Sequence, residues 1–297
     1  MDGKLESNRP SSSIDGGAAV RIYRPQPRLQ SYITFFYVVE ASAGLTDFLY
    51  PEWGNIRFAV AGEWHVDIPG FENSASQTAA LFGPTDRHGK IVTSGGKTIG
   101  FGLTPLGWHR LISGNASQMA NRVEPLGNRL GIEGETLRAQ LMLDETDEVS
   151  LVRLEQVILH LLDRKPPISC TVLAADRALR MRPTEVGEFA RAANVSARTL
   201  NRLCLNTFGF APKRLMRLQR FLDTLGRVRT AVGEALGDAI DSAYYDQSHF
   251  YRDFRDFMAM TPRAYFRAPR QLMAAAADAQ IRAGVTLSFR LPPQTIA

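Results

Sequence analysis

The chain has 297 residues, 44% of them apolar and 22% charged, which is an ordinary balance for a globular protein and enough length for two domains. No apolar run reaches the roughly 20 residues that a bilayer demands, which excludes a membrane-spanning helix within it. Residues 1–17 are polar and lack the hydrophobic core of a signal peptide, so we expect a flexible lead and a cytoplasmic protein.

The formal net charge of +5 is unevenly distributed. Residues 171–270 hold 17 basic and 10 acidic side chains, a surplus of +7, while the rest of the chain carries −2. A phosphate backbone would be attracted to this basic segment and indifferent to the remainder. A solvated basic surface without a partner is the alternative explanation.

Residues 20–103 have the pattern of a β-rich domain. Short β-branched or aromatic segments alternate with Gly, Pro, Asn and Ser, which is typical of a sandwich or barrel. The expected strands are Ala19–Tyr23, Ile33–Glu40, Thr46–Tyr50, Ile56–Ala61, Trp64–Ile68, Thr78–Phe82 and Thr98–Leu103.

The pattern becomes helical after Pro105, so the fold class is α+β. Helices are expected at Leu106–Ser113, Gly134–Leu143 and Val149–Leu162, and prolines at 166–167 mark a linker. We therefore expect a flexible segment 1–17, a β-rich domain 18–165 with trailing helices, an all-helical domain 166–270 and a tail 271–297. The tail has an alanine-rich helix and a short apolar run, 285–291, whose role stays open.

Residues 184–208 predict a first helix-turn-helix unit. Val186, Phe189, Ala190 and Ala193 form an apolar stripe on its first helix. Asn194 suits the sharp turn because Asn tolerates a positive φ, and Ser196 is a good N-cap for a second helix.

That second helix has two unlike faces. Leu200, Leu203, Cys204 and Thr207 share one side, and the other side carries Arg198, Asn201, Arg202 and Leu205. Arginine can bond both major-groove acceptors of guanine, and asparagine can do the same with adenine. The pattern favours a recognition helix, and a plain amphipathic surface helix is the alternative.

A second unit ends in residues 243–266. Phe250, Phe254 and Phe257 recur at helical spacing and are expected in the core. The opposite face carries Ser248, Tyr251, Arg252 and Arg255, with Gln247 and His249 beside it and Asp246 as a cap.

A basic helix, residues 213–229, connects the two units. A rigid connector would hold two recognition helices about one DNA turn, roughly 34 Å, apart. Its arginines, Arg217 among them, are expected to contact the intervening phosphates.

Both units resemble the DNA-binding domain of AraC/XylS-family transcription regulators. The matching stretches are VGEFARAANVSARTLNRLCLNTFGFAPKRLMRLQR and then YYDQSHFYRDF followed by TPRAYF, together about residues 183–266. The resemblance implies two helix-turn-helix subdomains joined by a linker helix. It also implies base contacts from Arg198, Asn201, Arg202, Gln247, Ser248, His249, Tyr251 and Arg252.

Three positions depart from the family pattern. The family prefers Gly where this chain has Ala243 and Ala259. It also prefers an apolar residue where this chain either has Asp238 or lacks one residue. Alanine at a positive φ is strained, so we expect the second unit to read bases less rigidly than the first.

The upstream half resembles, more loosely, a cupin-like sensor domain, in YPEWGNIRFAV, ALFGPTDRHGKIV and IGFGLTPLGWHRL. A pocket lined by Trp53, Phe58, Trp64 and Phe101 is one hypothesis, and a domain that only dimerises is another. The early histidines, His65, His88 and His109, form no His-x-His pair, so we expect no metal.

The sequence therefore predicts a non-enzymatic transcription regulator without a cofactor. Its expected partners are double-stranded DNA, RNA polymerase, a small-molecule effector and a second copy in a homodimer. The alternatives are a basic module that binds an acidic partner other than DNA, and a cupin-type enzyme fused to a DNA-binding domain. A repair enzyme with a metal-held cysteine would need clustered cysteines, whereas we expect Cys170 and Cys204 to be separate, reduced and packed.

Overall fold

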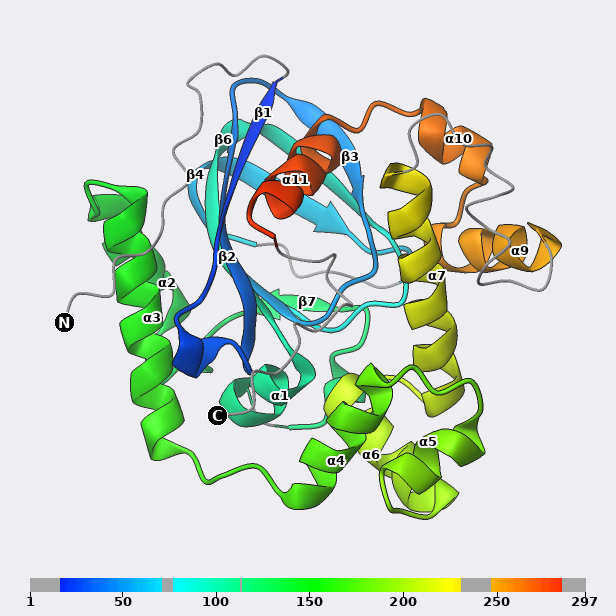
Figure 1. Cartoon of the computed structure of the whole chain (residues 1–297). Helices are drawn as coiled ribbons and strands as arrows, with labels where there is room; N and C mark the ends of the chain where they lie inside the picture. The colour runs from blue at the N-terminus through cyan, green and yellow to red at the C-terminus, as the bar shows by residue number, and fades with distance from the viewer. Residues whose placement is uncertain (1–16, 71–76, 113, 231–246, 285–297) are drawn as a thin grey trace.

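The computed structural model describes residues 17–70, 77–112, 114–230 and 247–284 (Figure 1). A β domain with covering helices comes first along the chain, and a helical domain packs beside it. The α+β fold class is thus confirmed. None of the helices in these ranges is both long and apolar enough to span a bilayer.

The β domain is built on one antiparallel sheet of seven strands. Six of them follow the order β1-β2-β6-β4-β5-β7, and β3 pairs with the N-terminal part of β6. The strands are β1 (Ala18–Tyr23), β2 (Ile33–Ala41), β3 (Leu45–Leu49), β4 (Asn55–Asp67), β5 (Ala79–Phe82), β6 (Gly89–Leu103) and β7 (Val123–Pro125).

β4 is one continuous strand where the sequence predicted two. It pairs with β6 from Asn55–Gly102 to Asp67–Lys90, with bulges on either side of Gly62. Gly62 has φ +69°, and a Cβ there would lie 1.8 Å from the Gly95 carbonyl oxygen. A bulge bends a strand without ending it. Gly62, which in the sequence indicates a break between two strands, therefore lies at a bend within β4.

The two faces of the sheet support two different cores. Phe36, Phe58 and Phe101 face the covering helices α2 (Gly134–Leu143) and α3 (Asp147–Arg164). Phe35, Tyr37 and Trp64 face the opposite way. Alternation along a strand produces this division, because neighbouring residues point to opposite faces.

The segment that joins the sheet to α2 is less regular than predicted. A short helix α1 (Pro105–Gly107) starts at Thr104, whose hydroxyl accepts from the Gly107 N–H, and a π-helical turn, Trp108–Ile112, follows it. The sequence predicted one helix here. It also missed β7, a three-residue strand ending in a proline, which gives no local pattern to recognise.

The helical domain comprises α4 (Cys170–Arg180), α5 (Val186–Ala192), α6 (Ala197–Phe208), α7 (Pro212–Thr230), α9 (Gln247–Met258) and α10 (Pro262–Arg267). Its core includes Tyr50 and Trp53 from the β domain, and Trp53 lies 6.1 Å, ring to ring, from Phe208. Gly209 ends α6 at φ +87°, where a Cβ would lie 2.6 Å from the Pro84 side chain. The two domains are therefore packed against each other through α6.

The last described helix, α11 (Gln271–Arg282), returns from the helical domain and lies across the β domain (Figure 1). Leu272 and Ala279 are buried there in the same cluster as Phe35 and Trp64. The predicted alanine-rich helix is thus present, whereas the apolar run 285–291 lies outside the described residues.

Both cysteines are free thiols. Cys204 is buried in α6, and burial raises its pKa to about 12. The prediction that Cys170 is packed is wrong: it is exposed on the first turn of α4, directly after the N-cap Ser169.

Candidate nucleic-acid interface

The turn between α5 and α6 has the predicted geometry. Asn194 has φ +52°, and the N–H of Val195 donates to the Ala190 carbonyl at 3.0 Å. The Ser196 hydroxyl accepts from the Thr199 N–H at 3.2 Å, which satisfies one of the first amides of α6. Residue types at two positions thus fix where the second helix starts and in which direction it runs.

The two faces of α6 differ as predicted. Leu200, Cys204 and Thr207 are buried, whereas Leu203 is only half-buried. The side chains of Arg198, Asn201 and Arg202 are exposed. The helix therefore presents long hydrogen-bonding side chains to solvent while its other side is fixed in the core.

α9 packs against α7 through a cluster of aromatic rings that both helices contribute. The ring of Phe221 lies 6.1 Å from that of Phe250, 5.5 Å from Phe254 and 5.1 Å from Phe257. All four rings are fully buried, which confirms the three phenylalanines of α9 as core. Their contacts with α7 determine which face of α9 points outward.

The outward face of α9 carries most of the predicted contact residues. Ser248, His249, Arg252 and Arg255 are exposed, and Tyr251 is half-buried with its ring 6.3 Å from Phe250. The side chain of Gln247 lies outside the described residues, as do Ala243, Asp246 and Asp238. Ala259, just beyond α9, has φ +52°, so the expected strain at this alanine is present.

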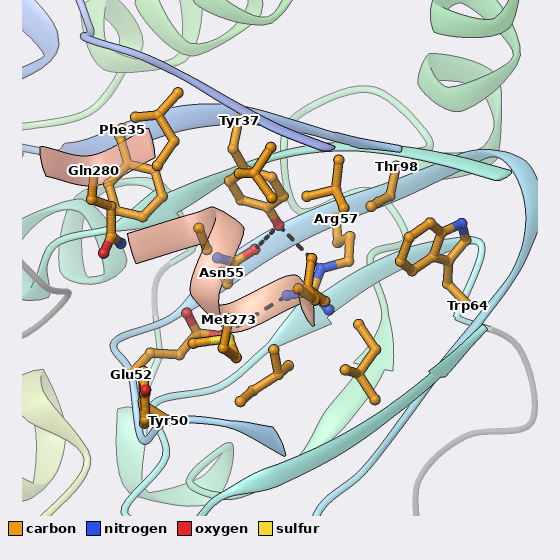
Figure 2. A pocket seen from close by; sticks show the side chains of 17 residues that line it. Phe35, Tyr37, Tyr50, Glu52, Asn55, Arg57, Trp64, Thr98, Met273 and Gln280 are labelled. Atoms are coloured by element: carbon orange, nitrogen blue, oxygen red, sulfur yellow. Dashed lines mark hydrogen bonds and ion pairs between the residues drawn. The ribbon is translucent and has the colours of Figure 1, made fainter. Parts of the chain in front are cut away.

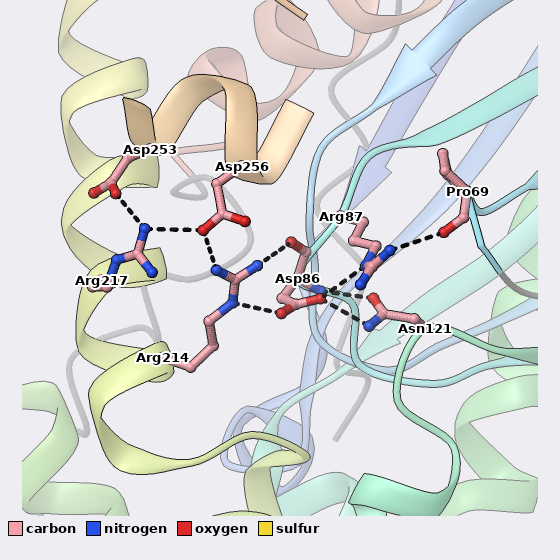
Figure 3. Close-up of polar contacts among 8 residues, drawn as sticks. All are labelled: Pro69, Asp86, Arg87, Asn121, Arg214, Arg217, Asp253 and Asp256. Atoms are coloured by element: carbon pink, nitrogen blue, oxygen red, sulfur yellow. Dashed lines mark hydrogen bonds and ion pairs between the residues drawn. The ribbon is translucent and has the colours of Figure 1, made fainter. Parts of the chain in front are cut away.

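Arg217 differs from the expectation of a free phosphate contact. Its Nη2 donates to Asp253 Oδ1 at 2.6 Å and to Asp256 Oδ2 at 2.9 Å, so it ties α7 to α9 (Figure 3). Burial alone would raise the pKa of Asp256, but the hydrogen bonds and charges of Arg214 and Arg217 outweigh it and hold this pKa below its usual range. No local pattern in the sequence predicts a pairing across 36 residues.

Residues 189–268 match the family model of a helix-turn-helix domain. The match starts at Phe189 on α5, covers α6, α7 and α9, and ends just after α10. This segment is an AraC-type helix-turn-helix domain.

The chain also has a low similarity to two solved structures of ToxT from Vibrio cholerae. One is 10% identical at a TM-score of 0.43 and covers 79% of this chain and 96% of that chain. The other is 11% identical at a TM-score of 0.41 and covers 75% and 98%. No curated protein sequence matches the chain significantly.

The AraC-type domain exposes further cations that the sequence patterns did not single out. Arg191 follows Ala190 on α5, and Arg263 and Arg267 lie on α10, all three with exposed side chains. Lys213, with which the predicted basic helix begins, is also exposed, on the first turn of α7. Their exposure, not their spacing, marks them as available to an anionic partner.

The β domain that precedes the AraC-type domain encloses a cavity of about 100 Å³, with α11 as one wall (Figure 2). Of the four aromatic residues predicted to line a pocket, only Trp64 does so. Phe58 and Phe101 point to the other face of the sheet, and Trp53 packs on Phe208. The prediction was wrong for these three because it did not assign each side chain to a face.

The early histidines do not converge. His65 is exposed, with its ring 2.9 Å from Asp67, and burial lowers the pKa of both His88 and His109. Among the described residues, no group of three His, Cys, Asp or Glu side chains is arranged to hold a metal ion.

Proposed function

We propose that this protein is a sequence-specific DNA-binding transcription regulator that reads two successive major grooves with α6 and α9. The observation that carries the proposal is the exposed set Arg198, Asn201 and Arg202 on a well-capped helix whose other face is buried. A helix so oriented fits the major groove, and these side-chain types form bidentate contacts with guanine and adenine.

The linker helix α7 supports the spacing that this reading needs. It has 19 residues, which at about 1.5 Å per residue extends roughly 28 Å, a length comparable to one turn of DNA. In this proposal, α7 sets the spacing of the two readers instead of gripping phosphates with Arg217. Exposed cations such as Lys213 and Arg263 take the phosphate contacts.

We further propose that the β domain controls DNA binding, through a small-molecule effector and through homodimerisation. The cavity beneath α11 is a place for an effector. For dimerisation, α2 and α3 expose large apolar side chains next to each other in the chain: Met142, Leu143, Val149 and Val152.

Selection of bound sites from a pool of random duplexes tests the function. The proposal predicts an enriched sequence with two half-sites about 10 base pairs apart per chain, and an affinity that falls steeply with salt. Equal affinity for every duplex would instead favour a basic module without sequence specificity.

A further inference from the structure

One arginine projects into the cavity of the β domain. Arg57 on β4 is 7% exposed, and its Nε donates to the Tyr37 hydroxyl at 3.1 Å (Figure 2). The Tyr37 hydroxyl donates in turn to Asn55 Oδ1 at 2.7 Å, so its only proton is already used. The guanidinium carbon lies 4.5 Å from the centre of the Phe82 ring. These contacts hold the guanidinium in one orientation.

The hydrogen bonds of Arg57 are incomplete. Its Nη1 is buried and has no hydrogen-bond partner among the described residues. Nη2 lies 4.0 Å from Glu52 Oε1, which is beyond hydrogen-bonding distance. A buried donor without an acceptor destabilises the fold, and more so when it is charged. A ligand that brings an acceptor to Nη1 would recover this free energy.

The charge of Arg57 is only partly balanced. Among the residues that line the cavity, the titratable ones are Tyr37, Tyr50, Glu52 and Arg57. Burial raises the pKa of Glu52 to about 7, and the charge of Arg57 limits the rise. Near neutral pH Glu52 is thus only partly ionised and does not fully balance the charge of Arg57, which favours an anion over a neutral or cationic group.

The remaining wall of the cavity is mostly apolar. It is formed by side chains such as Val39 and Ile91 from the sheet and by Leu272, Met273 and Ala276 from α11. An apolar cavity of about 150 Å³ accommodates one benzene molecule. By proportion, a cavity of about 100 Å³ suits a body of about four carbon atoms.

We propose that this cavity binds a small carboxylate with a short apolar body. Its carboxylate oxygen accepts from Nη1 of Arg57, and its body lies against α11. This ligand class deepens the effector control proposed above and rests on it.

The fold offers a direct route from this ligand to the DNA-binding domain. Tyr50 lines the cavity, and its hydroxyl is hydrogen-bonded to the hydroxyl of Tyr265 on α10. The Tyr265 ring lies 5.6 Å from that of Phe254 on α9. α11 is also anchored at both ends. Asp47 accepts from the Met273 N–H at 2.9 Å, and Arg24 donates to the Ala283 carbonyl at 2.7 Å. A ligand that stabilises α11 in its position on the β domain therefore also stabilises α10 and α9 in their present positions.

Titration calorimetry of the full chain without DNA tests the ligand class. The probes are butanoate and hexanoate, compared with their neutral amides and with hexylamine. The proposal predicts that the better carboxylate binds at least about tenfold more tightly than its amide, because only the carboxylate forms a charge-assisted bond to Arg57.

Three variants localise the site. Arg57→Met should remove the preference for carboxylate over amide, and Ala276→Leu, which fills the cavity from α11, should abolish binding of both. Arg28→Met is the matched control, because Arg28 lies on the surface beside Asp163 and its loss should change nothing.

Failure of both carboxylates to bind the wild-type chain, or equal binding of carboxylate and amide, would overturn the proposal. So would a carboxylate preference that survives Arg57→Met. If that variant does not fold, the wild-type comparison and Ala276→Leu still decide the matter. The calorimetry contains no DNA, so a failure of the carboxylates to bind would not contradict the proposed DNA-binding function. Likewise, a failed duplex selection would not contradict the binding of a carboxylate.

Discussion

Nε of Arg214 on the linker helix donates to Asp86 Oδ2 of the β domain at 2.6 Å. The same guanidinium bonds Asp256 of α9 and lies 4.3 Å from the Phe257 ring (Figure 3). Two residues along the chain from Asp86, the His88 N–H donates to the Phe257 carbonyl at 2.9 Å. One arginine thus joins the β domain, α7 and α9.

Asp86→Ala should weaken this junction. The side chain of Asp86 is largely buried and also accepts from Asn121 at 2.8 Å, so we expect the free energy of unfolding to fall by about 1–3 kcal/mol. Urea denaturation measures the change. Asp163→Ala, which removes an exposed pair with Arg28, is the control and should cost less than about 1 kcal/mol. Equal effects of the two variants would mean that the junction adds no stability.

Arg217→Ala should act on folding rather than on phosphate binding. It removes a 2.6 Å hydrogen bond from buried Asp253, and Arg220 lies farther away, at 3.4 Å, so we expect a loss of about 1–3 kcal/mol in the free energy of unfolding. The salt dependence of DNA affinity should stay as in the wild type. Lys213→Ala is the counterpart: stability should be unchanged, and the slope of log affinity against log salt should drop by about 1. A reduced slope in Arg217→Ala would restore Arg217 as a phosphate contact.

Ala259→Gly should stabilise the protein. Ala259 has φ +52°, a conformation that costs an L-residue with a Cβ about 1–2 kcal/mol, and glycine relieves it at the expense of a more flexible unfolded chain. We expect a net gain of up to about 1 kcal/mol in urea denaturation. Ala264→Gly, at an exposed site within α10, should instead destabilise by about 0.5–1 kcal/mol. A loss in both variants would show that the turn after α9 is not strained.

Glu52 should make stability fall as the pH rises. Burial raises its folded-state pKa to about 7 from an ordinary 4.5, so the folded chain holds this proton more tightly than the unfolded chain does. The resulting stabilisation is fully present below about pH 4.5 and is lost as the pH rises towards 7. Glu52→Gln removes it, so the difference in unfolding free energy between wild type and variant should change between pH 4.5 and 8. A constant difference over that range would mean that Glu52 titrates normally.

Local chemistry made much of the fold predictable. Ser196 and Asn194 located the start of α6, and the spacing of Phe250, Phe254 and Phe257 located the buried face of α9. These features depend on neighbours within one or two turns, which a sequence displays directly.

The long-range contacts were not predictable in the same way. Arg214 and Asp86 are 128 residues apart, and Asp47 and Met273 are 226 apart. In both pairs, the sequence around one residue does not indicate which residue is its partner. For the same reason, the sequence predicts a phosphate contact for Arg217, and it gives no role for α11.

The assignment of α6 as a DNA-reading helix is tested by measuring how wild type and Arg202→Ala bind the selected duplex. The same measurement is made on versions of this duplex with each base pair changed in turn. Arg202→Ala should lose about 1–3 kcal/mol on the selected duplex and become indifferent to the base pair that Arg202 reads. Arg129→Ala, on the surface of the β domain beside Glu124, should behave as wild type. If Arg202→Ala keeps the full base preference of the wild type, α6 is not the helix that reads DNA.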